Sequence, residues 1–404
     1  MMSNTSSLSE RSVSPVTSSE RLPWLGLLAL AMTGFISIIT ETLPAGLLPQ
    51  ISKGLDVSEA LAGQLVTLYA LGSLVAAIPL AAATRGWRRR PLLLLAICGF
   101  LVFNSVTAIS SNYILTLVAR FFAGVSAGVS WGMIAGYARR MVSDELKGRS
   151  MAVAMVGTPL ALTFGVPAGT FLGTLVGWRS VFGIMSLLTL VLIAWVLWKV
   201  PDYPGQAAHK RIPVLKVFTT PGVRPVLFVI LAWMLAHNIL YTYIAPYLAP
   251  AGLTQRIDLV LLIFGITALA GIWIIGVLID GWLRFLVLIS LIGFTLTSLT
   301  LGIAGSHSLV IYLGVAVWGL TYGGAATLVQ TALAEAAGED GVDVAQSINV
   351  TVWNLAIAGG GLAGGILLET LGVTSFPWAL FILSLLALIV AWRAKEHGFP
   401  SIRR

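Results

Sequence analysis

Long runs of apolar residues constrain this chain more than any other feature of its sequence. Twelve runs of about 20 residues follow one another between Pro23 and Arg393, separated by short polar connections. One helix of that length spans the hydrocarbon core of a bilayer. The composition agrees, because 57% of the residues are hydrophobic and only 10% are charged, against about 25% charged residues in a soluble domain. We therefore predict an all-α membrane protein with twelve transmembrane helices.

The predicted spans form two sets of six, one in each half of the chain. The first set covers residues 23–48, 59–83, 91–110, 113–137, 150–175 and 178–199. The second covers 223–249, 257–280, 283–304, 308–333, 346–371 and 374–393. We therefore expect an N-terminal six-helix half (23–199), a cytoplasmic connector (200–222) and a C-terminal six-helix half (223–393). Residues 1–22 and 394–404 are expected to be cytoplasmic tails, the first of them serine-rich, disordered and without the apolar core of a signal peptide.

The distribution of basic residues predicts the orientation of the spans. Of the 24 lysines and arginines, 20 fall in the tails and in the loops on the same side as the tails. The opposite side has only Lys53, Arg179 and Arg256, and Arg120 lies inside a span. Basic residues concentrate on the cytoplasmic side of membrane proteins, so we expect a multi-pass inner-membrane protein with both termini in the cytoplasm. This bias explains the net charge of +8 without a nucleic-acid partner.

Small residues recur at corresponding places in the two halves. The fifth span contains GVPAGTFLG, with Gly165, Pro167 and Gly169, and the eleventh contains GGGLAGG, with Gly360 and Gly361. Small residues let helix backbones approach closely. They favour two interpretations equally: faces along which the halves slide during transport, or ordinary tight packing.

Several motifs, in this order along the chain, resemble one known family. They are TETLPAGLLPQI (40–51), Arg120 with Gly124, GVPAG (165–169) with GWRSVF (177–182), YTYIAPYL (241–248), GVLID (276–280) and AQSINVTVWNLAIAGG (345–360). Over residues 23–393 the chain resembles the major facilitator superfamily, and within it the twelve-helix drug:proton antiporters near the sugar-efflux and arabinose-efflux permeases. The resemblance implies two pseudo-symmetric halves that rock about a midplane site, and no cofactor or metal.

The same resemblance implies a latch in the loops after the second and eighth spans. The second-half loop keeps Gly276, Asp280 and Arg284. The first-half loop reads AAATRGWRRR, with Ala81 and Arg85 where the family has glycine and aspartate. We therefore expect the latch to be stronger in the second half.

Glu41 is a carboxylate inside the first span, and burying a charge there costs about 2.5–3.5 kcal/mol on insertion scales. It belongs to a helical stripe that also contains Thr33, Ser37, Thr40 and Pro44. We predict that this stripe faces a cavity.

Arg120 lies at a similar depth to Glu41, roughly 10 Å from the outer surface at 1.5 Å per residue, and the family associates its fourth-span arginine with proton coupling. Because arginine stays protonated, we expect Glu41 to carry the proton. The alternatives are an acid that snorkels to the surface and an arginine in a fixed structural ion pair.

A substrate cavity is predicted from polar and aromatic residues at helical spacing. His237 lies near the middle of the seventh span, with Tyr241 one turn further on, and it could handle protons, bind substrate or pack. The candidate cavity residues are Ser37, Trp131, His237, Tyr241, Gln346, Asn349, Trp353 and Asn354. Such side chains suit small polar or amphipathic solutes rather than a polyanion.

The predicted function is proton-coupled efflux of small molecules by alternating access. Alternatives are an exporter dedicated to a sugar, nucleoside or amino acid derivative, a passive facilitator, and a membrane sensor that transports nothing. The sequence contains no GxxxxGK[ST], HExxH or Cys/His cluster, so we do not expect an enzyme. The expected partners are a small-molecule substrate, protons and the lipid bilayer, and the expected state is a monomer.

Overall fold

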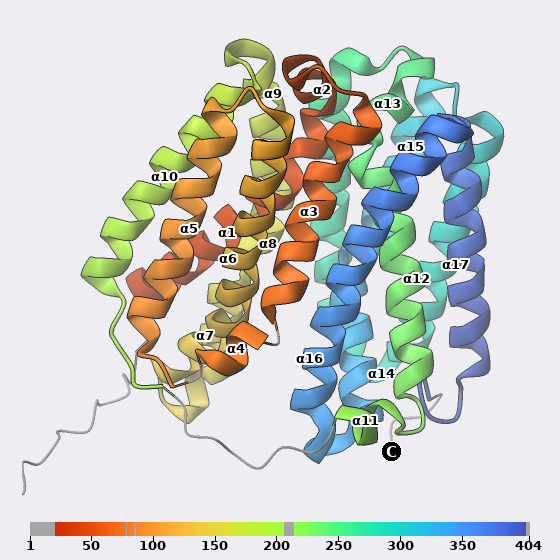
Figure 1. Ribbon diagram of the computed structural model, residues 1–404. Coiled ribbons are helices and arrows are strands. Elements are labelled where there is room, and N and C mark those ends of the chain that lie inside the picture. Colours follow the sequence, from red (N-terminus) through yellow and green to blue (C-terminus); the bar gives the residue numbers. More distant parts are fainter. Residues whose placement is uncertain (1–20, 78, 85, 206–213, 401–404) are drawn as a thin grey trace, which may run out of the picture.

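The structure is a computed structural model that describes residues 21–77, 79–84, 86–205 and 214–400, and helices make up nearly all of these segments (Figure 1). The all-α membrane fold predicted from the apolar runs is confirmed. Arg85 of the first-half latch motif lies outside the described residues, as do most of the N-terminal tail and the middle of the connector.

Helices α1 to α10 form the first bundle. Their bounds are α1 Trp24–Gly46, α2 Leu48–Leu55, α3 Glu59–Ala77, α4 Pro79–Ala83, α5 Arg89–Ile109, α6 Tyr113–Arg140, α7 Lys147–Met155, α8 Gly157–Leu160, α9 Val166–Val176 and α10 Trp178–Lys199. A short π-helix, Ala161–Gly165, joins α8 to α9. The predicted fifth span is therefore built from several short helices, in a stretch that contains Pro159 and Pro167.

The second bundle contains α12 to α17, and the short α11 (Val214–Phe218) precedes it. The bounds are α12 Val223–Thr242, α13 Ile244–Leu248, α14 Ile257–Ala304, α15 Ser308–Gly323, α16 Ala325–Thr370 and α17 Phe376–Arg393. Two of these helices are too long for one crossing. α14 is broken by the non-helical backbone of Trp282, and α16 by Gly338, whose φ is +70°.

These breaks account for the number of crossings. The described residues contain 11 stretches long and apolar enough to cross a membrane, and one of them, Thr254–Ala304, has 51 residues. At 1.5 Å per residue that stretch is more than twice as long as a bilayer core of about 30 Å. Since Trp282 divides it near its middle, it makes two crossings, which gives the twelve predicted.

The two bundles repeat the same close helix contact. A Cβ on Gly124 of α6 would lie 1.9 Å from the carbonyl oxygen of Tyr69 in α3. In the second bundle, a Cβ on Gly319 of α15 would lie 2.4 Å from the carbonyl oxygen of Phe264 in α14. Only glycine permits either approach. The fourth spans therefore correspond in structure as well as in sequence, which supports an internal repeat.

The bundles contact each other mainly on one side of the membrane. We call the side where α1 begins and α17 ends the proximal side, and the opposite side, which carries α2 and α13, the distal side (Figure 1). The ribbons of α3 and α16 lie side by side distally, and the two bundles separate toward the proximal side (Figure 1). Val66 and Ala70 of α3 pack there against Ile357 and Ala358 of α16.

Each bundle ties its proximal loop to the chain segment that leaves its last helix. In the first bundle, Arg88 forms an ion pair with Asp202 at 2.5 Å, and the backbone N–H of Arg89 donates to the carbonyl of Tyr203. In the second, the Arg284 guanidinium donates to the carbonyls of Ala391, Trp392 and Phe399. The basic end of the loop motif thus anchors the exit of both bundles.

Candidate functional site

Arg120 of α6 is completely buried inside the first bundle. Its Nη2 donates to the carbonyl oxygens of Thr40 and, at 3.5 Å, of Glu41, both in α1. Its Nε donates to the carbonyl of Leu65 in α3 at 3.4 Å. The guanidinium also lies 5.0 Å from the ring centroid of Tyr69, a favourable cation–π contact. Its Nη1 is buried without a hydrogen-bond partner in the described part of the chain.

Glu41 is half-buried on α1. Within the described residues its carboxylate forms no ion pair with Arg120, although its charge and that of Arg120 interact electrostatically. The charge of the Glu41 carboxylate also interacts electrostatically with the phenol groups of Tyr69 in the first bundle and of Tyr241 and Tyr322 in the second. Glu41 is therefore placed between a buried cation and the facing bundle.

The structure corrects the expectation that the polar stripe of α1 faces a cavity. Ser37 is fully buried, and its hydroxyl lies 3.2 Å from the hydroxyl of Tyr69 in α3. Thr40 is also fully buried and accepts a hydrogen bond from Asn104 of α5 at 3.0 Å. These side chains hold the first bundle together, so Ser37 does not line the cavity in this structure.

His237 lies at the centre of an aromatic cluster in the second bundle. Its ring stacks on Tyr322, with centroids 3.6 Å apart and planes 5° apart. Tyr241, Trp318 and Phe264 surround it at centroid distances of 5.2, 5.3 and 5.7 Å. These rings come from α12, α14 and α15, and we call these five residues the aromatic cluster.

The aromatic cluster contains polar atoms without partners. His237 Nδ1, the Tyr241 hydroxyl and Trp318 Nε1 are buried and make no hydrogen bond in the described part of the protein. Leaving such a group unpaired costs about 1–3 kcal/mol. Orphan polar atoms in a native site call for an explanation, and a ligand that supplies the missing hydrogen bonds is one.

The remaining predicted cavity residues have different surroundings. In α16, Asn349 is buried with an unpartnered Oδ1, whereas Asn354 Nδ2 donates to its own helix. Gln346 Nε2 donates to the carbonyl of Gln330 at 3.3 Å, and Trp353 packs against the distal contact with α3. Trp131 packs on α1 at Gly34, toward the proximal side. Of these residues, Asn349 resembles the aromatic cluster, because it too has a buried polar atom without a hydrogen-bond partner in the described part of the chain.

Tyr243 fastens the two bundles together on the distal side. Its hydroxyl bonds with the carbonyls of Gly361 at 2.8 Å and of Ala60 at 3.2 Å, and it accepts a hydrogen bond from Gln64 Nε2 at 3.2 Å. The ring lies in a cradle of glycines, since a Cβ on Gly63, Gly364 or Gly365 would lie within 2.7 Å of a Tyr243 atom. The helix breaks between α12 and α13 at this residue.

The predicted glycines differ in what they contact. Gly165 and Gly169 pack against Ile39 and Leu43 of α1, inside their own bundle. Pro167 is buried in the first turn of α9. Gly360 meets Asn238 of α12, also in its own bundle. Gly361 alone of this set faces the other bundle, where an added Cβ would lie 2.3 Å from Thr67 Oγ1.

The proximal latch residues also differ. Arg284 anchors the C-terminal segment as described above, whereas a Cβ on Gly276 would meet nothing within 4 Å. Asp280 is the acid of this motif, on the same turn of α14 as the Trp282 break. The close approach of backbones at Gly276 that a latch would use is therefore not formed in this conformation.

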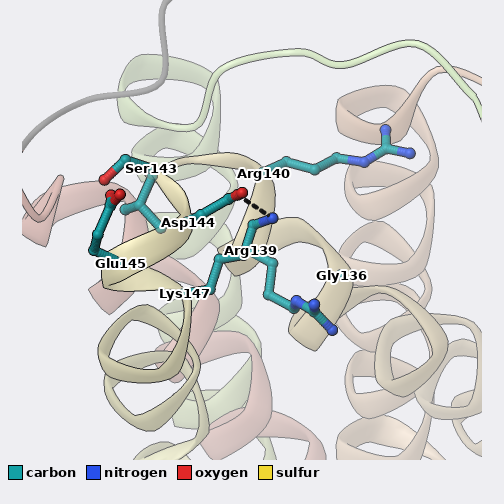
Figure 2. A pocket seen from close by; sticks show the side chains of 8 residues that line it. Gly136, Arg139, Arg140, Ser143, Asp144, Glu145 and Lys147 are labelled. Atoms are coloured by element: carbon teal, nitrogen blue, oxygen red, sulfur yellow. Dashed lines mark ion pairs between the residues drawn. The ribbon is translucent and has the colours of Figure 1, made fainter. Parts of the chain in front are cut away.

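A pocket of about 660 Å³ opens on the proximal side between α6 and α7. Figure 2 shows Arg139, Arg140 and Lys147 around it, with an ion pair between Lys147 and Asp144. Arg140 also donates to the carbonyl of Pro204 at 2.8 Å. This basic surface lies in the loop region that carries the positive charge bias, away from Glu41 and the aromatic cluster.

Sequence reasoning missed several residues that build these sites. Tyr69, Gln64, Phe264, Trp318 and Tyr322 were not predicted as site residues. Gln64 could have been found, because an amide inside an apolar span needs a partner. The aromatic residues carry no such signal, because rings are equally common in ordinary packing.

Twelve crossings in two equivalent bundles, with a buried arginine and an acid directed at the facing bundle, define a secondary transporter. Comparison with known families agrees: the model of the Major Facilitator Superfamily matches residues 30–358 and 255–401. The chain belongs to this superfamily.

Relatives and solved structures support this assignment. The chain is 28% identical over 381 residues to the purine ribonucleoside efflux pump NepI of Shigella sonnei (strain Ss046), which covers 92% of this chain and 94% of that protein. It is 28% identical over 358 residues to NepI of Escherichia coli (strain K12), covering 87% and 89%. Among solved structures, the D-xylose-proton symporter has a TM-score of 0.76 at 14% identity, covering 94% of this chain and 97% of that one. An inward-facing, unoccupied bacterial homologue of the human lysosomal transporter Spinster has a TM-score of 0.71 at 14% identity, covering 96% and 99%.

Proposed function

We propose that this protein is a proton-coupled antiporter that exports a small polar metabolite, with Glu41 as the proton carrier and Arg120 as its fixed positive partner. The observation that carries the proposal is the buried, unpartnered Nη1 of Arg120 on α6, whose charge interacts electrostatically with that of Glu41 on α1. A deprotonated Glu41 can accept a charge-assisted hydrogen bond from this nitrogen, whereas a protonated one is a weaker, neutral acceptor. Protonation therefore changes how α1 is held against α6.

The proposed cycle uses the position of Glu41 between the bundles. Binding of substrate at the facing aromatic cluster and binding of a proton to Glu41 would compete for the same region. This competition is the condition for antiport, because each ligand disfavours the other. We propose that the protein works as a monomer in the inner membrane, with the proximal side in the cytoplasm.

Glu41→Gln tests the coupling. The amide keeps the shape of the side chain and cannot exchange a proton, so pH-gradient-driven efflux in proteoliposomes should fall to the level seen without a gradient. Exchange of substrate for substrate, which needs no net proton movement, should continue. Asp56→Asn, at an exposed acid on the distal side, is the control and should transport like the wild type. Gradient-driven efflux at the wild-type rate in Glu41→Gln would show that Glu41 has only a structural role.

A purine nucleoside is the substrate that we propose for the aromatic cluster. The NepI relatives are named as purine ribonucleoside efflux pumps. A purine base offers a flat ring that can stack on tyrosine or histidine, and edge atoms that donate and accept hydrogen bonds. The unpaired atoms of His237, Tyr241 and Trp318 provide both kinds of partner for such edges.

The substrate proposal is tested by binding to purified protein. Inosine and adenosine should raise the unfolding temperature of the wild type, and Tyr322→Leu, which removes the stacked ring, should weaken this effect. Tyr312→Leu, on the same helix but outside the aromatic cluster, serves as the control. A panel of sugars, amino acid derivatives and cationic drugs distinguishes the alternatives, and stabilisation by one of these classes but not by nucleosides would refute the nucleoside proposal.

A further inference from the structure

A second pocket, of about 600 Å³, lies on the distal side between the two bundles. The first bundle contributes residues from α1, α2, α3 and α9, and the second contributes residues from α13, α14, α16 and the neighbouring 3-10 turns. Its volume falls within the range of about 300–1,000 Å³ that is typical of small-molecule sites. It lies beyond the Tyr243 contact, on the opposite side of that contact from the aromatic cluster.

The pocket contains two acids and no basic residue. Glu59 comes from the first turn of α3 and Asp258 from the first turn of α14. Both side chains are half-buried, and neither forms an ion pair or hydrogen bond with any described residue. The N-terminal ends of their helices favour negative charge.

The rest of the lining suits a ligand with hydrogen-bonding groups on a short apolar body. Gln50, Thr174 and Gln255 supply amides and a hydroxyl, while Pro49, Pro246 and Val373 supply apolar surface. A bare metal ion fits less well, because the described residues include no group of three or more His, Cys, Asp or Glu that could hold one.

We propose that this pocket binds a small organic cation from the distal side, and that the bound cation holds the bundles together. The two carboxylates face one pocket from separate bundles. A diamine can pair one ammonium group with each carboxylate and form two charge-assisted hydrogen bonds. Because the two carboxylates belong to different bundles, such a ligand favours the distally closed state and inhibits transport.

The test uses 1,4-diaminobutane as the probe and the purified full-length protein. Isothermal titration should show binding to the wild type, and Glu59→Gln/Asp258→Asn should weaken it by about tenfold or more, since the charge-assisted hydrogen bonds to both carboxylates are lost. 1,4-Butanediol, which is similar in shape and uncharged, should not bind. Asp56→Asn removes an exposed distal acid outside the pocket and should leave affinity for the diamine unchanged.

Other outcomes would overturn the proposal. Equal affinity in the wild type and the double variant would do so, as would an equal loss in Asp56→Asn, which would indicate general surface charge. In proteoliposomes, the diamine added on the distal side should slow efflux by the wild type and not by the double variant. Binding of the diamine should persist in Tyr322→Leu, so a failure of the nucleoside proposal is distinguishable from a failure of this one.

Discussion

Gly124 shows how much a single residue controls in this fold. It lies on α6 one turn beyond Arg120, at the point where α6 meets α3. The absence of a side chain lets the two backbones touch, and this approach brings Arg120 within reach of the Leu65 carbonyl on α3. The glycine is therefore part of the support of the buried guanidinium.

Gly124→Ala should destabilise the protein by about 1–3 kcal/mol, the usual cost of overpacking. The added methyl group would overlap the Tyr69 carbonyl, a backbone atom that cannot rotate away. Gly132→Ala is the matched control on the same helix, because a Cβ there meets nothing within 4 Å and alanine favours helix by up to about 1 kcal/mol. Thermal unfolding in detergent compares the two, and equal stability would contradict the close contact.

At the scale of elements, the seventh crossing is divided at the residue that joins the bundles. Tyr241, in the aromatic cluster, lies in the last turn of α12, and Tyr243, in the glycine cradle, lies at the break between α12 and α13. A shift of Tyr241 on substrate binding would act directly on this break.

Tyr243→Phe should loosen the distal contact. It removes the hydroxyl that bonds with Ala60 and Gln64 of the first bundle, and two hydrogen bonds of about 0.5–1.5 kcal/mol each correspond to roughly a tenfold shift toward distal opening. Spin-label distances between the distal ends of α3 and α16 measure this. Tyr247→Phe removes a hydroxyl that bonds with Leu301 inside the second bundle and should leave the distances unchanged. Unchanged distances in both variants would show that Tyr243 does not hold the bundles.

The elements themselves were largely predictable, whereas their contacts were not. Hydropathy determines where a chain can cross a bilayer, so the predicted first span, 23–48, closely matches α1. Helical periodicity correctly put Ser37 and Glu41 on one face, but it could not show that α3 and α5 cover most of that face. Likewise, the glycines at 165 and 169 indicated a close contact without showing that α1 is the partner.

At the scale of the whole molecule, the same kind of anchor occurs in both bundles: Arg88 with Asp202 in the first, and Arg284 with the carbonyls at the end of the last helix in the second. In the first anchor, partial burial raises the pKa of Asp202. Hydrogen bonds from the Arg90 backbone N–H and the Arg88 side chain outweigh this effect and leave the pKa below its usual value of 3.8. A carboxyl whose pKa is lowered by folding stabilises the folded state above its usual pKa and loses this effect as the pH falls through the lowered value.

Asp202→Asn should therefore be less stable than the wild type at neutral pH, and the difference should shrink as the pH falls below about 4. The temperature of unfolding, measured between pH 3 and 7, tests this. Asp56→Asn, at an exposed acid, should show no such convergence. A constant difference between Asp202→Asn and the wild type across the range would exclude the ion pair as its cause.

The orientation that we propose for the whole molecule rests on the positions of its basic residues. Reporter fusions at the C-terminus and at residue 210 should show a cytoplasmic location, and one near residue 255 the opposite side. The physical reason is the 20-to-3 excess of lysine and arginine on the proximal side. An external C-terminus would contradict both this orientation and the direction of transport that we propose.

The support of Arg120 by main-chain carbonyls also has an evolutionary consequence. The oxygens of Thr40, Glu41 and Leu65 that accept its hydrogen bonds are present whatever side chains occupy those positions. If Glu41 carries the proton as we propose, a lineage could replace it and lose its dependence on protons in one step while the arginine stays in place. Descendants that move their substrate downhill and those that move it uphill could then share one architecture and differ at a single codon.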